Sequence, residues 1–152
     1  MALFLSTFVN KVDRKGRVSV PATFRAALGA QRFPGIVAFS SFKFPALDCC
    51  GIDRMEELSI RHELLEQFSE DYENLSALFS GVHELPFDGE GRIVLPAHLA
   101  AHAGITEQAA FVGQGSMFQI WEPQRFEERR AAVLERVRRQ GLKLPPLGRG
   151  TQ

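Results

Sequence analysis

An internal duplication constrains this 152-residue chain more than any other feature. The ten residues that begin at Asp13 return 75 positions later, beginning at Asp88, with Asp, Gly, Arg, Pro and Ala in register. The likeness continues at a spacing of 71 positions, because residues 47–50 match 118–121 and residues 54–57 match 125–128. A solenoid needs at least about three repeats, so two copies do not predict one. We expect two copies of one unit, related by a pseudo-twofold axis.

Each copy is predicted to run strand, strand, helix, strand, strand, helix. Asp13 and Asp88 each start an Asp-x-x-Gly segment, which is typical of a tight turn between two short strands. The sequence therefore predicts a β-hairpin at the start of each copy, at residues 7–20 and 82–95. The first helix of each copy is expected to follow at residues 21–28 and 96–103, with a proline at its start and a glycine after its end.

The longest predicted helical segment ends the first copy. Asp53 and Glu56 have the spacing of an N-cap and its capping-box partner, and apolar residues then recur at spacings of three, four and seven up to Phe79. This stripe indicates core or a subunit seam, on one helix or on a helix pair. We expect a first unit at residues 1–80, a second at residues 81–140 and a mobile tail at residues 141–152, where Pro145 and Pro146 stop the helix.

Composition indicates a folded cytoplasmic protein. Apolar residues make up 45% of the chain, no stretch of about 20 apolar residues predicts a membrane span, and the start of the chain lacks the basic region of a signal peptide. The net charge of zero hides a segregation. Residues 1–47 hold seven basic groups against one acid, residues 48–90 hold two against twelve, and residues 91–152 hold nine against five. A neutral total therefore does not exclude a nucleic-acid partner.

Catalytic and metal chemistry are poorly supported. His98 and His102 lie one helical turn apart, but no Cys or carboxylate close in sequence completes a metal site. Cys49 and Cys50 are adjacent, form neither a C-x-x-C pair nor part of a triad, and fit a buried strand. Gly113 and Gly115 belong to a turn and do not open a helix, so phosphate cradling is not expected. We predict no enzyme, no cofactor and no small-molecule substrate.

The two turns are the candidate site. An Asp and an Arg four positions apart across a tight turn lie within reach of each other, as at Asp13 with Arg17 and at Asp88 with Arg92. An Arg oriented in this way on a β-ribbon can read guanine in the DNA major groove, while Arg14 and Lys15 would contact phosphates. The alternative is structural, with the Asp capping the turn and the Arg paired internally. The second turn has Gly89 and Glu90 in place of the two basic residues, so we expect the first turn to contribute more to DNA affinity.

The whole pattern resembles the MraZ family of bacterial transcriptional regulators, over nearly the whole chain to about residue 140. The resemblance rests on the two D-x-x-G-R turns at this spacing and on the segments at residues 8–10, 102–105 and 118–121. It implies an α+β fold of two tandem AbrB-like swapped-hairpin β-barrel units that form an intrachain pseudo-dimer with flanking α-helices. Cys49 and Cys50 depart from the branched or aromatic residues usual in their strand, which bears on local packing.

The resemblance also implies a function. Members of the family bind short repeated G-rich boxes in double-stranded DNA upstream of the division and cell-wall gene cluster, and usually repress that cluster and their own gene. It implies a ring-shaped homo-oligomer in the cytoplasm, associated with the nucleoid, and DNA-binding roles for Asp13, Arg14, Lys15, Arg17, Asp88 and Arg92. Two alternatives stay open: an antitoxin-like DNA-binding protein, and a purely structural ring-forming oligomer whose hairpins make subunit contacts.

Overall fold

The computed structural model describes residues 2–148 and has an α+β fold. Its first half contains four strands and three helices: β1 (Thr7–Lys11), β2 (Arg17–Ser19), α1 (Ala22–Leu28), β3 (Gly35–Ser40), β4 (Ala46–Cys50), α2 (Ile52–Glu63) and α3 (Glu70–Ser80). Its second half contains the counterparts: β5 (His83–Pro86), β6 (Arg92–Val94), α4 (Ala97–Ala103), β7 (Gln108–Gly113), β8 (Phe118–Trp121) and α5 (Pro123–Gln140). The predicted order of elements is confirmed, with the helical segment that ends the first copy formed by a helix pair, α2 and α3.

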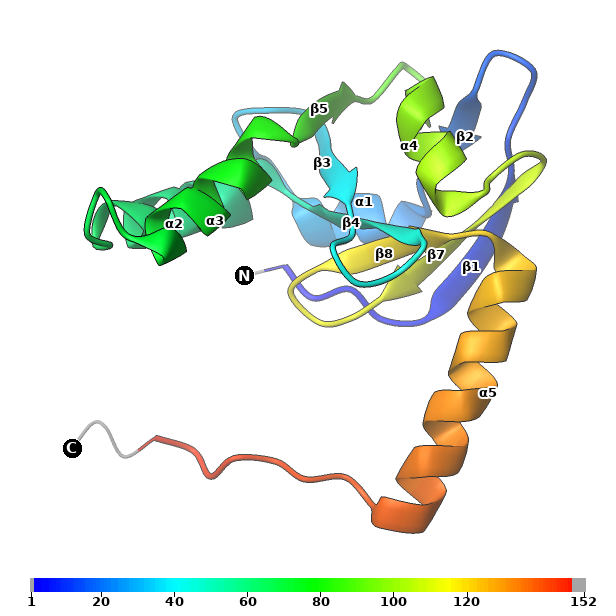
Figure 1. Cartoon of the computed structure of the whole chain (residues 1–152). Helices are drawn as coiled ribbons and strands as arrows, with labels where there is room; N and C mark the ends of the chain where they lie inside the picture. The colour runs from blue at the N-terminus through cyan, green and yellow to red at the C-terminus, as the bar shows by residue number, and fades with distance from the viewer. Residues whose placement is uncertain (1, 149–152) are drawn as a thin grey trace.

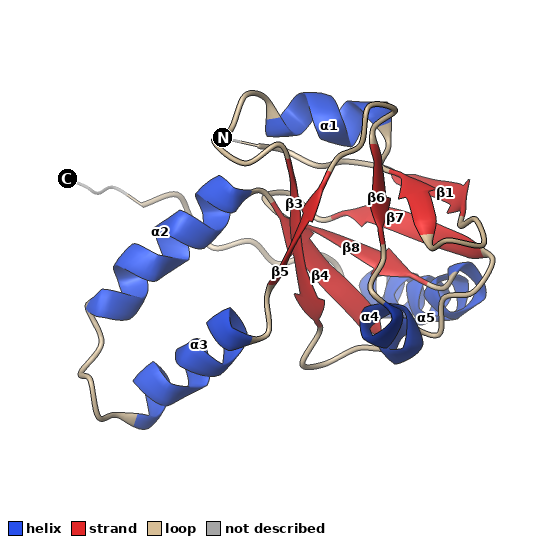
Figure 2. Ribbon diagram, turned by 90° about the horizontal axis from the view of Figure 1, so that it is seen from above, coloured by secondary structure: helices blue, strands red, loops and turns tan. Residues whose placement is uncertain are grey.

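The strands form two antiparallel sheets in which the copies are intermixed (Figure 1). The larger sheet has the order β1-β7-β8-β4-β3-β5, and the smaller one consists of β2 and β6. β1 of the first copy therefore pairs with β7 of the second, and β5 of the second copy pairs with β3 of the first. Figure 2 shows the strands gathered in one body, with α1 and α4 against them.

In each of two ladders, the register pairs one residue with its own counterpart in the duplication. Val18 pairs with Ile93 across β2 and β6, and these residues are 75 positions apart in the sequence. Asp48 pairs with Gln119 across β4 and β8, and these are 71 positions apart. An antiparallel pair has this property when a twofold axis runs between its strands.

The predicted hairpins form turns but not ladders. In the first copy, β1 and β2 are connected by the expected turn, yet they share only an isolated bridge between Val12 and Val18. Beyond the turn the two strands diverge, because β1 joins β7 and β2 joins β6. The expectation of two locally paired strands is therefore corrected: each strand finds its partner in the other copy.

The buried apolar residues form three clusters, and the largest of them contains residues of both copies. Phenylalanines from both copies meet in it, and the Phe24 ring lies 5.0 Å from that of Phe118 and 6.5 Å from that of Phe111. Cys49 and Cys50 are fully buried and free, as expected of residues in a core strand. Burial raises the pKa of the Cys50 thiol to about 12, so this side chain stays protonated and packs as a small apolar group.

The acidic segment forms a two-helix arm, which we define as α2, α3 and the loop between them, residues 52–80. Figures 1 and 2 both show the arm projecting from the sheets. The predicted capping box is wrong: α2 begins after Gly51 without a side-chain cap, and Glu56 instead forms an ion pair of 2.5 Å with Arg32. The cap that the sequence analysis missed is Ser69, whose hydroxyl accepts from the Tyr72 N–H and starts α3.

α5 leaves the sheets on a different side from the arm (Figure 1). Glu122 caps its start and Phe126 packs against Trp121, with ring centroids 5.8 Å apart. Residues 141–148 continue without helix or strand, and the rest of the tail predicted at residues 141–152 lies outside the described residues. No helix within residues 2–148 combines the length and the apolar character that a membrane crossing requires.

Candidate nucleic-acid interface

The first turn is held by three hydrogen bonds to the carboxylate of Asp13, two of which come from Arg17. Oδ1 of Asp13 accepts hydrogen bonds from the backbone N–H groups of Lys15, at 2.9 Å, and Arg17, at 2.8 Å. Oδ2 accepts from Nε of Arg17 at 2.7 Å. Gly16 closes the turn with a φ of 80°, which favours glycine because it has no side chain to clash with the backbone. The turn thereby fixes both the backbone and the guanidinium of Arg17.

The second turn repeats this geometry. Oδ1 of Asp88 accepts from the backbone N–H groups of Glu90 and Arg92, both at 2.9 Å, and Oδ2 accepts from Nε of Arg92 at 2.8 Å. Gly91 takes the place of Gly16, with a φ of 77°. Each aspartate therefore does both things that the sequence predicts. Its Oδ1 closes the turn by accepting from backbone N–H groups, and its Oδ2 orients the arginine.

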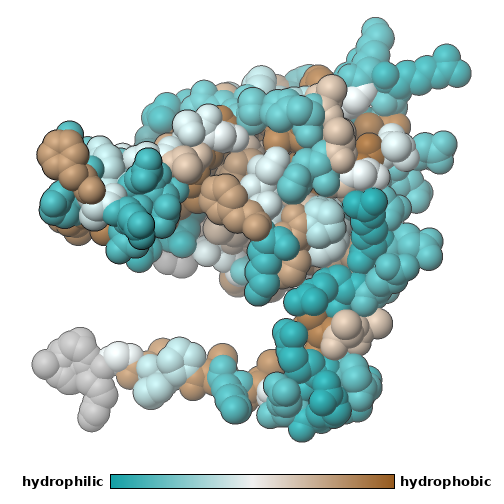
Figure 3. All heavy atoms as spheres, viewed as in Figure 1, coloured by the Kyte–Doolittle hydropathy of each residue, from teal (hydrophilic) through white to brown (hydrophobic). Residues whose placement is uncertain are grey.

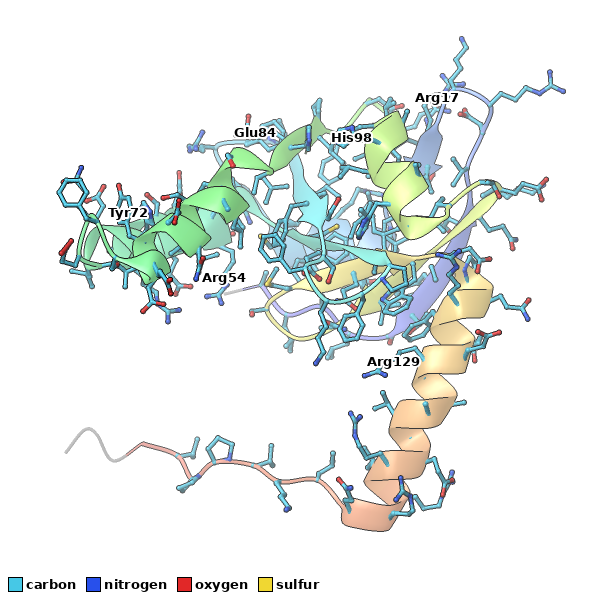
Figure 4. The ribbon with its side chains drawn as sticks, viewed as in Figure 1. Arg17, Arg54, Tyr72, Glu84, His98 and Arg129 are labelled. Atoms are coloured by element: carbon cyan, nitrogen blue, oxygen red, sulfur yellow. The ribbon has the colours of Figure 1, made fainter. Side chains whose placement is uncertain are left out.

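The turns differ in what else their arginines contact. Nη2 of Arg92 forms an ion pair of 2.7 Å with Glu90, whereas Arg17 has no partner besides Asp13 among the described residues. Its two terminal nitrogens are therefore available to a ligand. Arg14 and Lys15 are exposed and also make no ion pair within the described part of the chain. Figure 4 shows Arg17 at the end of the molecule away from the arm, beside the loop that carries these side chains.

Arg25 is a part of this region that the sequence analysis did not assign. Its guanidinium donates to the carbonyl oxygen of Val20 and lies so close to Gly91 that a Cβ added there would meet Cζ of Arg25 at 2.6 Å. The second turn therefore rests on a side chain from the helix of the first copy. The counterpart of Arg25 in the duplication is Ala100, so this difference between the copies is the signal that could have identified it.

The hydrogen bonds also set the charge of the two sites. The backbone N–H of Arg17 is the largest cause that holds the pKa of Asp13 below its ordinary value of 3.8, and the guanidinium of Arg17 adds to the effect. The backbone N–H of Arg92 acts in the same way on the pKa of Asp88. The Asp88 carboxylate raises the pKa of Arg92. Arg17 and Arg92 lie at the two ends of the three-residue β2–β6 ladder, opposite Val94 and Ser19.

The other candidate residues do not assemble into a site of their own. Nε2 of His98 lies 3.0 Å from Nε2 of His83, and Nε2 of His102 lies 3.1 Å from the carbonyl oxygen of Phe44, so the two α4 histidines face different partners. Among residues 2–148, no group of three or more His, Cys, Asp or Glu side chains could hold a metal ion. The two Asp-Arg turns are therefore the candidate site, and the same geometry occurs in both copies.

Known proteins are similar in sequence to this chain over most of its length. The family described as "MraZ protein, putative antitoxin-like" matches residues 78–138. The "Transcriptional regulator MraZ" of Rickettsia rickettsii (strain Sheila Smith) is 48% identical over 129 residues, which span 84% of this chain and 87% of the relative. Its namesake in Rickettsia peacockii (strain Rustic) is 47% identical over the same shares, and that in Rickettsia bellii (strain OSU 85-389) is 46% identical over 130 residues.

The names of these relatives describe regulators of transcription and not enzymes. The identity is near one half and extends over more than four fifths of both chains. The chain belongs to the MraZ family of transcriptional regulators.

Proposed function

We propose that this protein regulates transcription by binding double-stranded DNA through its two Asp-Arg turns. The observation that carries the proposal is the duplicated geometry, in which one carboxylate fixes each arginine through Nε. Among the described residues, both terminal nitrogens of Arg17 and Nη1 of Arg92 are left without an ion-pair partner. An arginine fork held in one orientation is suited to the O6 and N7 atoms of guanine, which lie side by side in the major groove. Two such turns on one chain match a DNA element that is itself repeated.

The flanking charges support a division of labour between the turns. Arg14 and Lys15 would bind phosphates, which supply affinity without sequence information. At the second turn, Glu90 repels phosphates and occupies one nitrogen of Arg92. We infer that the first turn supplies most of the affinity and that both arginines contribute to specificity, with Asp13 and Asp88 as the residues that orient them.

We infer further that the chain is an intrachain pseudo-dimer of two AbrB-like swapped-hairpin units, residues 1–80 and 81–140. Support comes from the ladders in which Val18 meets Ile93 and Asp48 meets Gln119, since each joins a residue to its own repeat. It also comes from the exchange of strands, because the first strand of each copy lies in the other copy's part of the sheet. The pseudo-twofold axis would present the two turns symmetrically to DNA.

The biological setting follows from the family resemblance. We propose that several copies assemble into a ring whose turns bind tandem G-rich boxes upstream of the division and cell-wall gene cluster, so that avidity makes modest single contacts effective. The expected outcome is repression of that cluster and of the protein's own gene, in the cytoplasm at the nucleoid. Because the charge of the whole chain is zero, nonspecific affinity should be modest.

Two substitutions in the first turn test the proposal. Arg17→Ala should reduce both the affinity and the preference for the chain's own upstream DNA over scrambled DNA, because it removes one of the two proposed base contacts. Lys15→Ala should weaken binding to both DNAs alike and reduce the slope of log affinity against log salt by about 1. The measurement is a band shift across a salt series. Unchanged operator preference in Arg17→Ala would show that the turn does not read bases.

The two alternatives differ from the proposal in the partners that they bind. The words "putative antitoxin-like" in the description of the matching family favour an antitoxin-like DNA-binding protein as the second candidate, and such a protein would also bind a toxin partner. A purely structural oligomer, in which the turns make subunit contacts, would show no salt-dependent DNA binding. Measuring the mass of the protein alongside the band shift distinguishes the latter from a DNA-binding ring.

A further inference from the structure

The segment after α5 exposes apolar side chains that are not covered by any of the described residues. Leu142, Leu144 and Leu147 are 78%, 86% and 92% exposed. Pro145 and Pro146 stand between the last two of them and favour an extended polyproline conformation, which loses little entropy on binding. Figure 3 shows these apolar residues alternating with polar ones along the tail. A segment of this kind is typical of a ligand for an aromatic groove.

The outer end of the arm has such a groove. A hollow of about 380 Å³ at the start of α3 is lined by Phe68, Tyr72, Glu70, Glu73 and three polar residues. Phe68 is 88% exposed, and the Tyr72 ring is held in place by stacking on His62 at 4.0 Å. Figure 4 places Tyr72 at the end of the arm that is far from the sheets. The groove therefore offers two aromatic side chains, one of them fixed, to an incoming segment.

The charges of the two surfaces are complementary. Residues 52–80 hold eight acids against two basic residues, while residues 123–148 hold seven basic residues against three acids. Glu70 and Glu73 make no ion pair within the described residues, and neither does Lys143, which precedes Leu144. Docking the leucines and prolines beside the aromatic rings would bring Lys143 toward the unpaired carboxylates at the rim of the groove.

We propose that residues 144–147 of one copy dock into the groove formed by Phe68 and Tyr72 of a second copy. In Figure 1 the tail runs back beneath the sheets and stays apart from the arm of the same chain, and its leucines are exposed. A contact between two different surfaces is head-to-tail, so it can repeat from copy to copy and close into a ring. The inference rests on the proposed assembly of copies and identifies the surfaces that would join them.

Disulfide cross-linking between unlike copies tests the contact. Full-length Phe68→Cys protein is mixed with isotope-labelled Leu147→Cys protein without DNA, and the products of mild oxidation are identified by mass spectrometry. Cys49 and Cys50 are buried and do not compete. The expected product joins one labelled and one unlabelled copy through positions 68 and 147. A matched control replaces Leu147→Cys with Leu5→Cys, at a side chain that is 61% exposed but lies outside the tail.

Cross-linking no faster than that of the Leu5→Cys control would overturn the proposal. So would a Phe68→Cys, Leu147→Cys double variant that cross-links only within single chains, because the tail would then occupy its own groove. If the wild type is a multi-copy assembly while the cross-link fails, other surfaces join the copies; the tail contact is then refuted and the proposed DNA-binding function is untouched.

A charge exchange provides the second test. Lys143→Glu and Glu70→Lys should each weaken self-association about tenfold in sedimentation experiments, and the double variant should recover most of the loss, since it restores the pair in reverse. Glu63→Lys, which adds the same charge to the arm outside the groove, is the control for a general charge effect. Equal weakening by Glu63→Lys, or no recovery in the double variant, would refute the contact.

Discussion

At the scale of single residues, two aspartates organise the candidate interface. Asp13 accepts two backbone N–H groups with one oxygen and the arginine Nε with the other, and Asp88 repeats the arrangement. An asparagine would keep the backbone bonds and lose the contact to the guanidinium, because its second atom is a donor. The acidic side chain is therefore needed for orienting the arginine and not merely for closing the turn.

The pKa of these aspartates is directly measurable. Because hydrogen bonds lower the pKa of Asp13 and Asp88 in the folded state, their contribution to folding is present above the ordinary value of 3.8 and is lost as the pH falls through the lower folded value. Carboxyl-carbon NMR should show both titrating below 3.8. In Arg17→Ala the pKa of Asp13 should rise only part of the way, since the backbone bonds remain. Titration at or above 3.8 would contradict the turn geometry.

Substitution by alanine should have different effects on stability at Gly89 and at Gly91, which both lie in the second turn. Gly91→Ala should destabilise the fold by about 1–2 kcal/mol, because its φ is 77° and a Cβ would meet the Arg25 guanidinium. Gly89 has no heavy atom within 4 Å of an added Cβ, so Gly89→Ala should change stability by less than about 0.5 kcal/mol. Urea unfolding measures both. Equal effects of the two substitutions would show that Gly91 is not under this constraint.

At the scale of elements, the ladder between β2 and β6 connects the two turns, so the position of each turn depends on the other. Each strand has three residues, and the pair is anchored by Val18 and Ile93, both 1% exposed. A two-stranded ladder is at best marginally stable in water, so the apolar side chains beneath it must hold it in place. The positions of Arg17 and Arg92, at the ends of this ladder, follow from that packing.

Adjacent substitutions in β6 test this dependence. Ile93→Ala should cost about 2–5 kcal/mol of unfolding free energy, since it leaves a cavity in the core under both turns. Val94→Ala, at a side chain that is 54% exposed in the same strand, should cost less than about 1 kcal/mol. Chemical denaturation provides both values. A similar cost at the two positions would mean that the ladder is not held by its buried face.

At the scale of the whole molecule, the charge is sorted by location. The basic side chains of the first turn and the acidic arm lie at opposite ends, as Figure 4 shows for Arg17 and Tyr72. Electrostatic interactions at physiological ionic strength decay over about 8 Å, so each end presents its own field to a partner. This arrangement allows a chain with no net charge to present a basic surface to one partner and an acidic surface to another.

Two substitutions that change the net charge equally should therefore differ in effect. Glu90→Gln should raise DNA affinity by roughly three- to tenfold at low salt, because it removes a repulsion at the second turn and releases Nη2 of Arg92. Glu63→Gln, in the arm, should leave the affinity unchanged. Fluorescence anisotropy with operator DNA compares them. If Glu63→Gln strengthens binding as much as Glu90→Gln, the DNA contacts the arm or responds only to total charge.

Much of the fold could be predicted because the signals are local. Turn chemistry at Asp13 and Asp88, and glycines after α1 and α4, act within a few residues, and the duplication allowed each assignment to be made twice. The capping box expected at Asp53 and Glu56 is wrong: α2 begins earlier, after Gly51, and Glu56 pairs with Arg32, 24 positions away in the sequence. The support of the second turn by Arg25 was missed because it depends on contact between the copies.

The sequence by itself determined the repeated unit, the order of its elements, the residues of both turns and the separation of charge, because these depend on spacing along the chain. Only the tertiary structure decided which strands pair. β1 had an adjacent partner in β2 but pairs with β7 instead, since exchange between the copies buries the shared core that neither copy encloses alone. That exchange also pairs β2 with β6 and so places Arg17 and Arg92 at the two ends of one short ladder.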